Sequence, residues 1–221
     1  MARPGRPARN PAASPDEPPA DAGTLAGTLA GALAIAPLTP DRWPDVERLF
    51  GPRGACGGCW CMAWRLTRAE WERQKGEANR AAFRRVVEGG PPPGVLAYAG
   101  QAPVGWCAVA PRDAYSHLER SRVLRRVDAT PVWSVSCLFV AKPYRRRGVS
   151  VALLRAAAEL ARAQGAVVVE GYPVDAASGT MPDPFAWTGT VSAFRAADFV
   201  EVARGSPTRP IMRRLLSGGR G

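Results

Sequence analysis

The chain has 221 residues, of which 46% are apolar and 22% are charged, and its formal net charge is +11. This length and balance are typical of one globular domain, with or without a tail, that buries a substantial core. No apolar stretch approaches the ~20 residues that a membrane-spanning helix requires, so no membrane segment is expected. The five cysteines are odd in number and irregularly spaced, which argues against a disulfide framework and indicates a reducing compartment. The positive charge favours an anionic partner, although an arginine-rich proteome would produce the same excess.

The N-terminal segment is rich in proline and alanine, and we expect residues 1–30 to form a disordered tail. Three arginines precede an apolar stretch at 24–36, an arrangement that partly resembles a secretory signal peptide. However, Asp16 and Glu17 lie within the basic region, and glycines and threonines interrupt the apolar stretch. These features argue against export, so the sequence predicts a cytoplasmic protein with a single folded domain over 31–221.

The first predicted elements are a strand, a helix, a cysteine-containing loop and two further helices. Thr39-Pro40 supplies a cap followed by proline, which favours a helix start. Thr67, with Glu70 three residues later, has the spacing of a capping box, in which each side chain satisfies a free amide at the helix start. The predicted ranges are 32–38 for the strand, 39–51 for the first helix, 51–64 for the loop, and 67–76 and 78–87 for the later helices.

From about residue 95 onward the pattern is mostly that of strands. Residues 95–99 and 104–110 flank a turn and predict a hairpin. After a polar, basic segment at 112–130, a long apolar strand leads through a turn into a helix and then into another buried strand. This strand–helix–strand order implies a parallel pair, so we predict an α/β fold with a mixed sheet. The remaining predicted strands are 132–140, 167–172, 200–204 and 211–215, and the remaining helices are 151–164 and 192–197.

The segment between the long strand and the next helix carries the clearest functional signal. Arg145-Arg146-Arg147-Gly148 forms a basic turn directly before the helix. Helix starts leave amide N–H groups unpaired and carry the positive end of the helix dipole, so they bind phosphate groups well. Gly148 lets the backbone approach such a ligand closely because it has no side chain. A solvated basic turn is the alternative, but the order of strand, arginines, glycine and helix favours a pyrophosphate site.

This segment resembles the acetyl-CoA motif of GNAT N-acetyltransferases, which reads Arg/Gln-x-x-Gly-x-Gly/Ala after the fourth strand; here Ser150 replaces the last small residue. The resemblance implies a GNAT-like, mostly antiparallel sheet flanked by helices, in which one parallel strand pair splays to hold the cofactor. It also implies that the backbone of 146–151 holds the pyrophosphate of acetyl-CoA and that residues 138–140 pair with the pantetheine. The implied cofactor-binding residues are Leu138, Phe139, Val140, Arg145, Arg146, Arg147, Gly148, Val149, Ser150, Val151 and Phe194.

The chain departs from the family at a second landmark. GNAT enzymes often end with Tyr-x-x-x-Gly-Phe, whose tyrosine can protonate the leaving thiolate, whereas this chain has Phe194 at that position and Asp198 in place of the glycine. Phe194 can pack against the cofactor but has no proton to donate. Deprotonation of the amine also needs a base, and Glu170 and Tyr172 share a face of the strand that borders the acetyl group in the family. Both are therefore catalytic candidates, and the alternative for Glu170 is a strand-end carboxylate paired with arginine.

A cluster of cysteines, Cys56-Gly57-Gly58-Cys59-Trp60-Cys61, is the other unusual feature. It is compatible with apolar packing around a glycine-rich loop, with a thiolate metal site or with a reactive thiol. A fourth metal ligand is missing nearby and the only histidine, His117, is distant in sequence, so no metal is predicted. Some GNAT-like proteins have a similar stretch where the family shapes the acceptor site, and Trp60 and Trp64 are candidates for lining it. We expect His117 in a loop.

Together these features favour an enzyme that transfers an acetyl group from acetyl-CoA to an amine by direct attack. The missing tyrosine leaves a non-catalytic acyl-CoA-binding module as the alternative. Nucleic-acid binding through the basic surface is disfavoured because the basic residues are not interleaved with aromatic ones. The expected partners are acetyl-CoA and an amine acceptor that the sequence does not identify, without nucleic acid or membrane, and a homodimer is left open.

Overall fold

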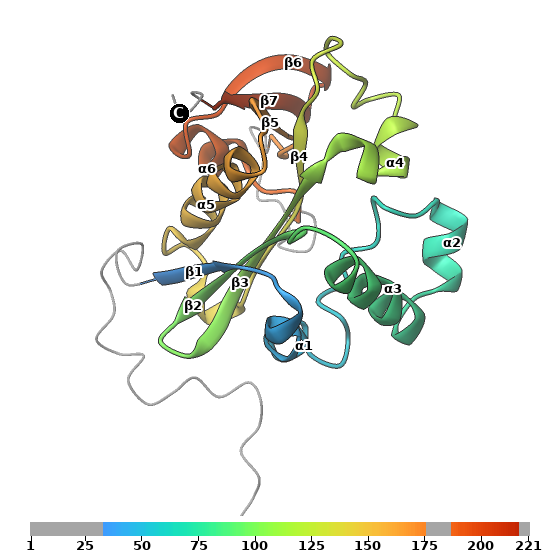
Figure 1. Cartoon of the computed structure of the whole chain (residues 1–221). Helices are drawn as coiled ribbons and strands as arrows, with labels where there is room; N and C mark the ends of the chain where they lie inside the picture. Colours follow the sequence, from blue (N-terminus) through green and yellow to red (C-terminus); the bar gives the residue numbers. More distant parts are fainter. Residues whose placement is uncertain (1–32, 176–186, 217–221) are drawn as a thin grey trace, which may run out of the picture.

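A computed structural model describes residues 33–175 and 187–216. Its strands are β1 (Leu33–Pro37), β2 (Gly94–Ala99), β3 (Ala102–Pro111), β4 (Trp133–Val140), β5 (Val168–Gly171), β6 (Val200–Ser206) and β7 (Arg209–Leu215). They form one sheet in the order β1-β2-β3-β4-β5-β7-β6 (Figure 1). Within it β4 and β5 are parallel and the other neighbours are antiparallel. The predicted mixed, mostly antiparallel sheet is confirmed, whereas the tail expected at 1–30 lies outside the described residues.

The helices follow the local signals closely. They are η2 (Pro40–Arg42), α1 (Trp43–Phe50), α2 (Arg68–Arg73), α3 (Glu77–Glu88), η3 (Arg112–Ala114), α4 (Ser116–Glu119), η4 (Lys142–Tyr144), α5 (Val149–Ala163) and α6 (Val191–Ala196). The capping box is confirmed: the Thr67 hydroxyl accepts from the Glu70 N–H, and the Glu70 carboxylate accepts from the Thr67 N–H at 2.9 Å. Residues 40–42 form a separate 3-10 turn, so α1 begins later than predicted. By contrast, α5 begins at Val149, earlier than the predicted start at 151 and directly after Gly148.

Halfway along its length, β4 separates from β5. Its first three residues pair with the end of β5. On the other edge, Val135 and Cys137 pair with the consecutive residues Val109 and Ala108, so Ser136 is the extra residue of a β-bulge. A bulge bends a strand and increases its twist. Beyond it β4 stays paired with β3 but not with β5, and the parallel pair splays apart as the resemblance implied.

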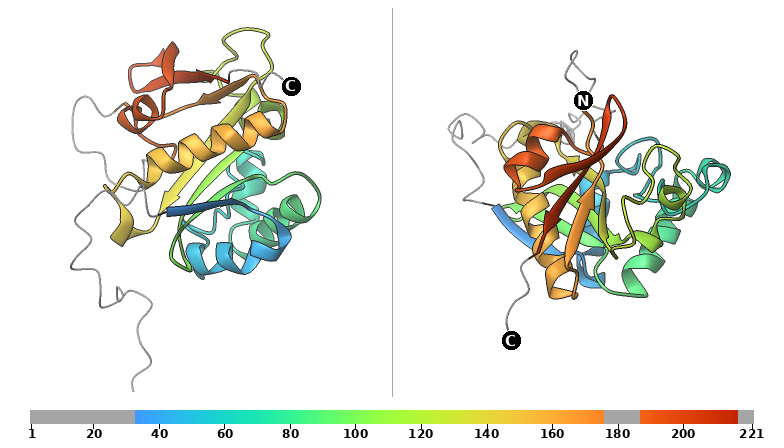
Figure 2. Two further views of the ribbon diagram at one scale, coloured as in Figure 1. Left: turned by 60° about the vertical axis from the view of Figure 1, so that its left-hand side comes forward. Right: turned by 90° about the horizontal axis from the view of Figure 1, so that it is seen from above.

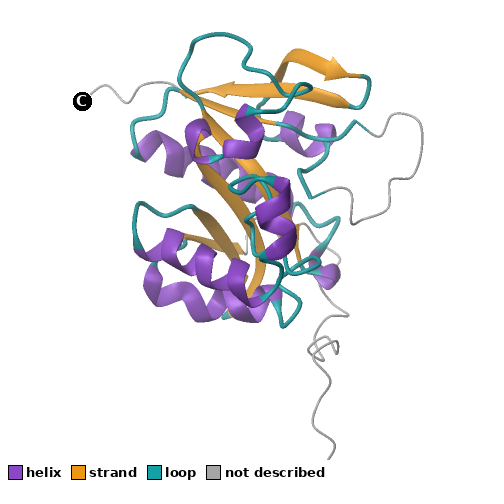
Figure 3. Ribbon diagram, turned by 90° about the vertical axis from the view of Figure 1, so that its right-hand side faces the viewer, coloured by secondary structure: helices purple, strands orange, loops and turns teal. Residues whose placement is uncertain are grey.

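Helices cover both faces of the sheet. The views agree that α1 and α3 lie on one face and that α5 and α6 lie on the other (Figures 1 and 2). Figure 3, seen from the side of α2 and α4, shows helices and loops in front of the strands. None of the helices within the described ranges combines the length and the apolar character needed to cross a bilayer.

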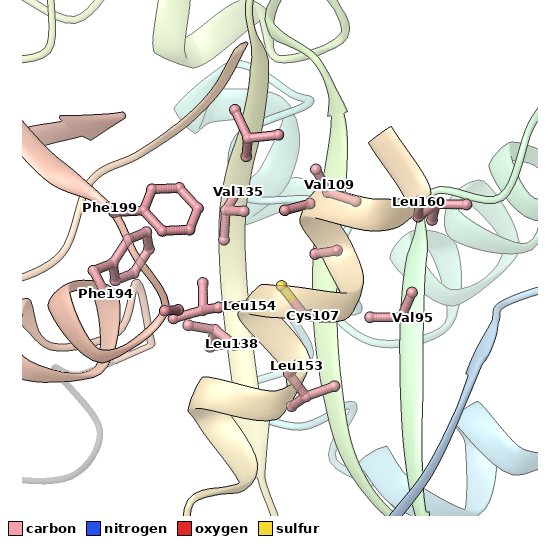
Figure 4. Close-up of a cluster of buried hydrophobic side chains, with 14 of the residues drawn as sticks. Val95, Cys107, Val109, Val135, Leu138, Leu153, Leu154, Leu160, Phe194 and Phe199 are labelled. Atoms are coloured by element: carbon pink, nitrogen blue, oxygen red, sulfur yellow. The ribbon is translucent and has the colours of Figure 1, made fainter. Parts of the chain in front are cut away.

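Two apolar cores hold these layers together. On one face, Leu153 and Leu154 of α5 are fully buried against β3 and β4, with Phe194 and Phe199 beside them (Figure 4). The opposite core contains the apolar side of α1, Phe83 of α3 and part of the cysteine loop. Burying each of these large side chains contributes about 1.5–3 kcal/mol to the stability of the fold.

Candidate functional site

The turn between β4 and α5 can bind an anion through its backbone. Gly148 adopts φ 81° and ψ −3°, a left-handed conformation that is strained for any residue with a side chain. Arg146, two residues earlier, also has a positive φ of 61°. Turns with such residues direct successive N–H groups to one side, and the first amides of α5 have no acceptor within the helix. The predicted order of strand end, basic turn and helix start is present in the structure.

A groove of ≈ 310 Å³ lies against this turn and the end of β4. We call it the β4–α5 groove, and its lining residues are Ala55, Cys56, Leu138, Phe139, Val140, Arg145, Ser150, Trp187, Gly189 and Thr190. Five of the predicted cofactor-binding residues are among them. The side chain of Val149 instead points into the core, so this residue can contribute only its backbone. Arg146, Arg147, Gly148 and Val151 belong to the adjoining turn and first helical turn.

Phe194 does not line the groove, contrary to the expectation that it packs against the cofactor. Its side chain is fully buried. A Cβ atom at Gly171 or at Gly189 would lie 2.1 Å or 2.8 Å from the ring, so the ring fits closely between these two glycines. Phe199 contacts it edge-on with centroids 4.9 Å apart. The residue at the tyrosine position of the family is thus part of the core in this chain.

A second hollow, of ≈ 390 Å³, adjoins the groove on the side of α2. We call it the cysteine-lined cavity, because Cys56, Cys59, Cys61 and Cys137 all line it. Its other lining residues are Phe50, Ala55, Gly57, Ala63, Trp64, Arg68, Trp71, Glu72, Lys75, His117, Leu138, Phe139 and Trp187. Aromatic rings therefore form much of its wall, with charged groups contributed by α2 and the residues directly after it. Of the two tryptophans expected to line an acceptor site, Trp64 lines this cavity, whereas Trp60 is buried in the core beside it.

The thiols of Cys61 and Cys137 form a hydrogen-bonded pair in the cavity wall. The Trp106 indole N–H donates to the Cys61 sulfur at 3.2 Å. The Cys137 thiol donates to the same sulfur. These hydrogen bonds, together with the positive charge of Arg65, lower the pKa of the Cys61 thiol although it is buried. The pKa of Cys137 is raised because its proton is held in that hydrogen bond and because it is poorly hydrated.

The backbone at Cys61 is strained as well. Trp60 and Cys61 have consecutive positive φ angles of 45° and 60°. Such conformations cost of the order of 1–3 kcal/mol each and are concentrated at functional sites. All five cysteines are free. No group of three or more potential metal ligands occurs among the residues that the structure describes. Cys61 is buried in the apolar core beside Trp60, which agrees with apolar packing around the loop, while its lowered pKa is the one feature in common with a reactive thiol.

His117 lies in the short helix α4 and not in the expected loop, and it also lines the cavity. Its main-chain N–H donates to the Trp64 carbonyl at 3.0 Å, and its ring lies 5.4 Å from the Trp64 ring. Its Nδ1 atom is 3.2 Å from the Ala63 carbonyl oxygen. A carbonyl only accepts, so Nδ1 carries the hydrogen and Nε2 is left with a lone pair. The only sequence signal for a role of His117 was that it is the single histidine of the chain. No local pattern places residue 117 beside residue 63.

Glu170 and Tyr172 are brought together, but away from both hollows. The Glu170 carboxylate is fully buried; one oxygen accepts from Arg112 at 2.8 Å and from the Tyr172 hydroxyl at 2.7 Å, and the other accepts from Arg213 at 2.8 Å. Burial and the Glu170 charge raise the pKa of Tyr172 well above its ordinary value. Neither residue lines the groove or the cavity. The geometry thus favours the alternative interpretation of Glu170, a carboxylate paired with arginine, over catalysis by either residue.

The splayed end of β4 is bridged by the chain that follows β5. The N–H of Leu138 donates to the Trp187 carbonyl at 2.7 Å. Pairing of a pantetheine chain with Leu138, as the resemblance implied, therefore requires this hydrogen bond to be exchanged. Val174 and Thr190 form an isolated bridge nearby, which keeps this segment beside the groove.

The topology defines a mixed α/β protein whose parallel pair separates beside a left-handed glycine and a helix start. The family model described as the acetyltransferase (GNAT) family matches residues 59–177, which is more than half of the chain. The chain therefore belongs to the GNAT acetyltransferase family.

Similar solved structures include an acetyltransferase of the GNAT family from Streptococcus pneumoniae, with 15% identity, a TM-score of 0.48, and coverage of 84% of this chain and 99% of that chain. Another is the PaiA N-acetyltransferase from Thermoplasma acidophilum in complex with coenzyme A, with 12% identity, a TM-score of 0.46, and coverage of 83% and 99%. No curated protein sequence matches this chain significantly.

Proposed function

We propose that this protein transfers an acetyl group from acetyl-CoA to the nitrogen of a small amine by direct attack, in the cytoplasm. The observation that carries the proposal is the shared wall of the two hollows. Ala55, Cys56, Leu138, Phe139 and Trp187 line both the β4–α5 groove and the cysteine-lined cavity. A cofactor in the groove and an acceptor in the cavity would therefore meet at the splayed end of β4.

The groove offers what acetyl-CoA requires. The backbone of 146–151, with Gly148 at its centre, would hold the pyrophosphate, and the positive charges of Arg145, Arg146 and Arg147 add attraction for it. Leu138, Phe139 and Val140 would run along the pantetheine. Bound acetyl-CoA would supply the acyl group as a thioester. The amide of Leu138, once released from Trp187, would be available to polarise the thioester carbonyl.

The cavity is suited to a small acceptor rather than a large one. Its volume of ≈ 390 Å³ lies at the lower end of small-molecule sites, which span about 300–1,000 Å³. Its wall is largely aromatic and apolar, which excludes water and favours an acceptor with an apolar body. Holding the amine beside the thioester would supply much of the rate through proximity and orientation. The leaving thiolate, with an ordinary pKa near ~8.5, can depart without the family tyrosine.

The alternative is a non-catalytic acyl-CoA-binding module, which the phenylalanine at position 194 favours. The deciding experiment incubates the protein with acetyl-CoA and a set of primary amines, including 2-phenylethylamine, benzylamine and lysine. Free CoA and the N-acetyl product are measured by chromatography. Time-dependent release that depends on both amine and protein supports the transferase. Calorimetric binding of acetyl-CoA without release of CoA for any amine supports the binding module. The absence of both binding and release excludes both the transferase and the binding module.

A further inference from the structure

Amine attack at neutral pH requires a proton acceptor in the cavity, and this inference rests on the function proposed above. An alkylammonium has a pKa near ~10.4, so it must lose a proton before its nitrogen can attack. Glu170, the carboxylate predicted for this role, is fully buried, and three hydrogen-bond donors engage its two oxygens. The base must therefore be sought among the groups that line the cysteine-lined cavity.

The cavity wall has few candidates. Glu72 is exposed, and its carboxylate is engaged by Lys75 in an ion pair. The pKa of Cys59 and that of Cys137 are raised, mainly by burial for the first and by hydrogen bonding for the second. Both therefore keep their protons. The Cys61 side chain is buried and accepts from the Trp106 indole at 3.2 Å, and its lowered pKa makes its thiolate a weak base.

His117 differs from all of these groups because one of its ring nitrogens is oriented and the other is open. The Ala63 carbonyl fixes Nδ1 as the donor. The hydrogen bond from the His117 main-chain N–H to the Trp64 carbonyl holds the start of α4, the helix that carries His117, against residues 63–64. Nε2 has no hydrogen-bond partner among the described residues, and the half-buried ring lines the cavity. A general base needs a ring nitrogen with a free lone pair and a second group that fixes the tautomer, and His117 has both.

The geometry points to Nε2 of His117 as the general base of the acetyl transfer. Nε2 first takes one proton from the ammonium, which frees the nitrogen lone pair to bond to the thioester carbon. The carbon–sulfur bond then breaks, the sulfur leaves with the bonding electrons, and the thiolate takes up the second proton that the nitrogen loses as the amide forms. The Ala63 carbonyl stabilises the imidazolium, because Nδ1 keeps donating to it. The imidazolium then returns its proton to solvent. The charged groups that share the cavity with His117 are Arg68, Lys75 and Glu72.

The first test does not depend on any acceptor. The chain contains one histidine, so labelling with ring-15N histidine yields a single pair of ring nitrogen signals. We expect neutral His117 to carry its hydrogen on Nδ1, with Nε2 unprotonated and shifted when 2-phenylethylamine is added at high concentration. A hydrogen on Nε2 in the neutral form would overturn the proposal, because the lone pair would then face Ala63.

The second test uses His117→Asn, whose amide can keep donating to the Ala63 carbonyl but cannot accept a proton. With acetyl-CoA and 2-phenylethylamine, we expect kcat to fall about 10²-fold or more at neutral pH and the loss to shrink at high pH, where free amine is abundant. Acetyl-CoA affinity, measured by calorimetry, should be unchanged. The control is Ser116→Ala, which removes a neighbouring hydrogen bond to the Arg65 carbonyl and should leave turnover nearly unchanged.

Wild-type turnover in His117→Asn across the pH range would exclude His117 as the base. An equal loss in Ser116→Ala would also overturn the proposal, because the effect would then come from disturbing α4. If the wild-type protein binds acetyl-CoA but acetylates no amine, the proposed function fails, and the nitrogen spectrum still decides whether His117 has the inferred tautomer.

Discussion

Replacing Glu170 by glutamine tests whether the buried carboxylate stabilises the fold or takes part in catalysis. Glutamine has the same shape, so the change removes the charge and exchanges one oxygen for an NH2 group. Arg112 and Tyr172 donate to one carboxylate oxygen and Arg213 donates to the other. In either orientation of the glutamine amide, its NH2 group faces an arginine that also donates. The replacement therefore always loses at least one hydrogen bond to a guanidinium.

The magnitude follows from the burial of the three partners. Removing one member of a buried ion pair costs about 3–5 kcal/mol. Arg112 keeps Glu119 and Arg213 keeps Asp128, and both of these carboxylates are partly exposed, so the lower end applies. We expect a loss of about 3 kcal/mol. For a chain of this size, that corresponds to a fall in Tm of roughly 6–12 °C.

The assay is urea unfolding followed by circular dichroism and by tryptophan fluorescence. The control is Glu201→Gln, which breaks an exposed pair with Arg204 at 2.7 and 2.8 Å, and such surface pairs are worth only about 0–1 kcal/mol. If Glu170→Gln lost no more stability than this control, the structural role would be refuted. A fall in turnover at neutral pH without a loss of stability would restore Glu170 as the general base.

Two further changes test the groove and the thiol pair. Gly148→Trp should abolish acetyl-CoA binding in calorimetry while the protein stays folded. The control is Gly165→Trp at the other end of α5, where φ is a similar 84° and the space around the residue is open. This control carries the same backbone strain of about 1–2 kcal/mol and should bind acetyl-CoA normally. Unchanged affinity in Gly148→Trp would end the argument for a phosphate cradle. For the thiols, alkylation of Cys61 by iodoacetamide, followed by peptide mass spectrometry against pH, should have a midpoint below the ordinary thiol pKa of ~8.5. Cys137→Ala removes the leading cause of that lowered pKa, so the midpoint should move upward, and an unmoved midpoint would contradict the inferred pairing.

Features that depend on neighbours along the chain could be predicted from the sequence. The capping box at Thr67 and the turn before α5 are confirmed because their hydrogen bonds and backbone angles involve residues only a few positions apart. The hairpin of β2 and β3 and the parallel pair of β4 and β5 were also predicted, since strand periodicity and connection length limit the pairing. The resemblance to GNAT enzymes extended this reading to the family, which the family model confirms.

The surroundings of Glu170, His117 and Cys61 were decided by tertiary structure alone. Glu170 meets arginines 58 and 43 residues away, His117 meets a carbonyl 54 residues away, and Cys61 meets an indole 45 residues away. The sequence shows that a glutamate lies in an apolar strand, but whether it is paired or open to a substrate depends on which strands and loops fold against it. The free energy of an ionisable group is set by its hydration and its nearest charges, and these are properties of the folded surroundings rather than of the residues beside it in the chain.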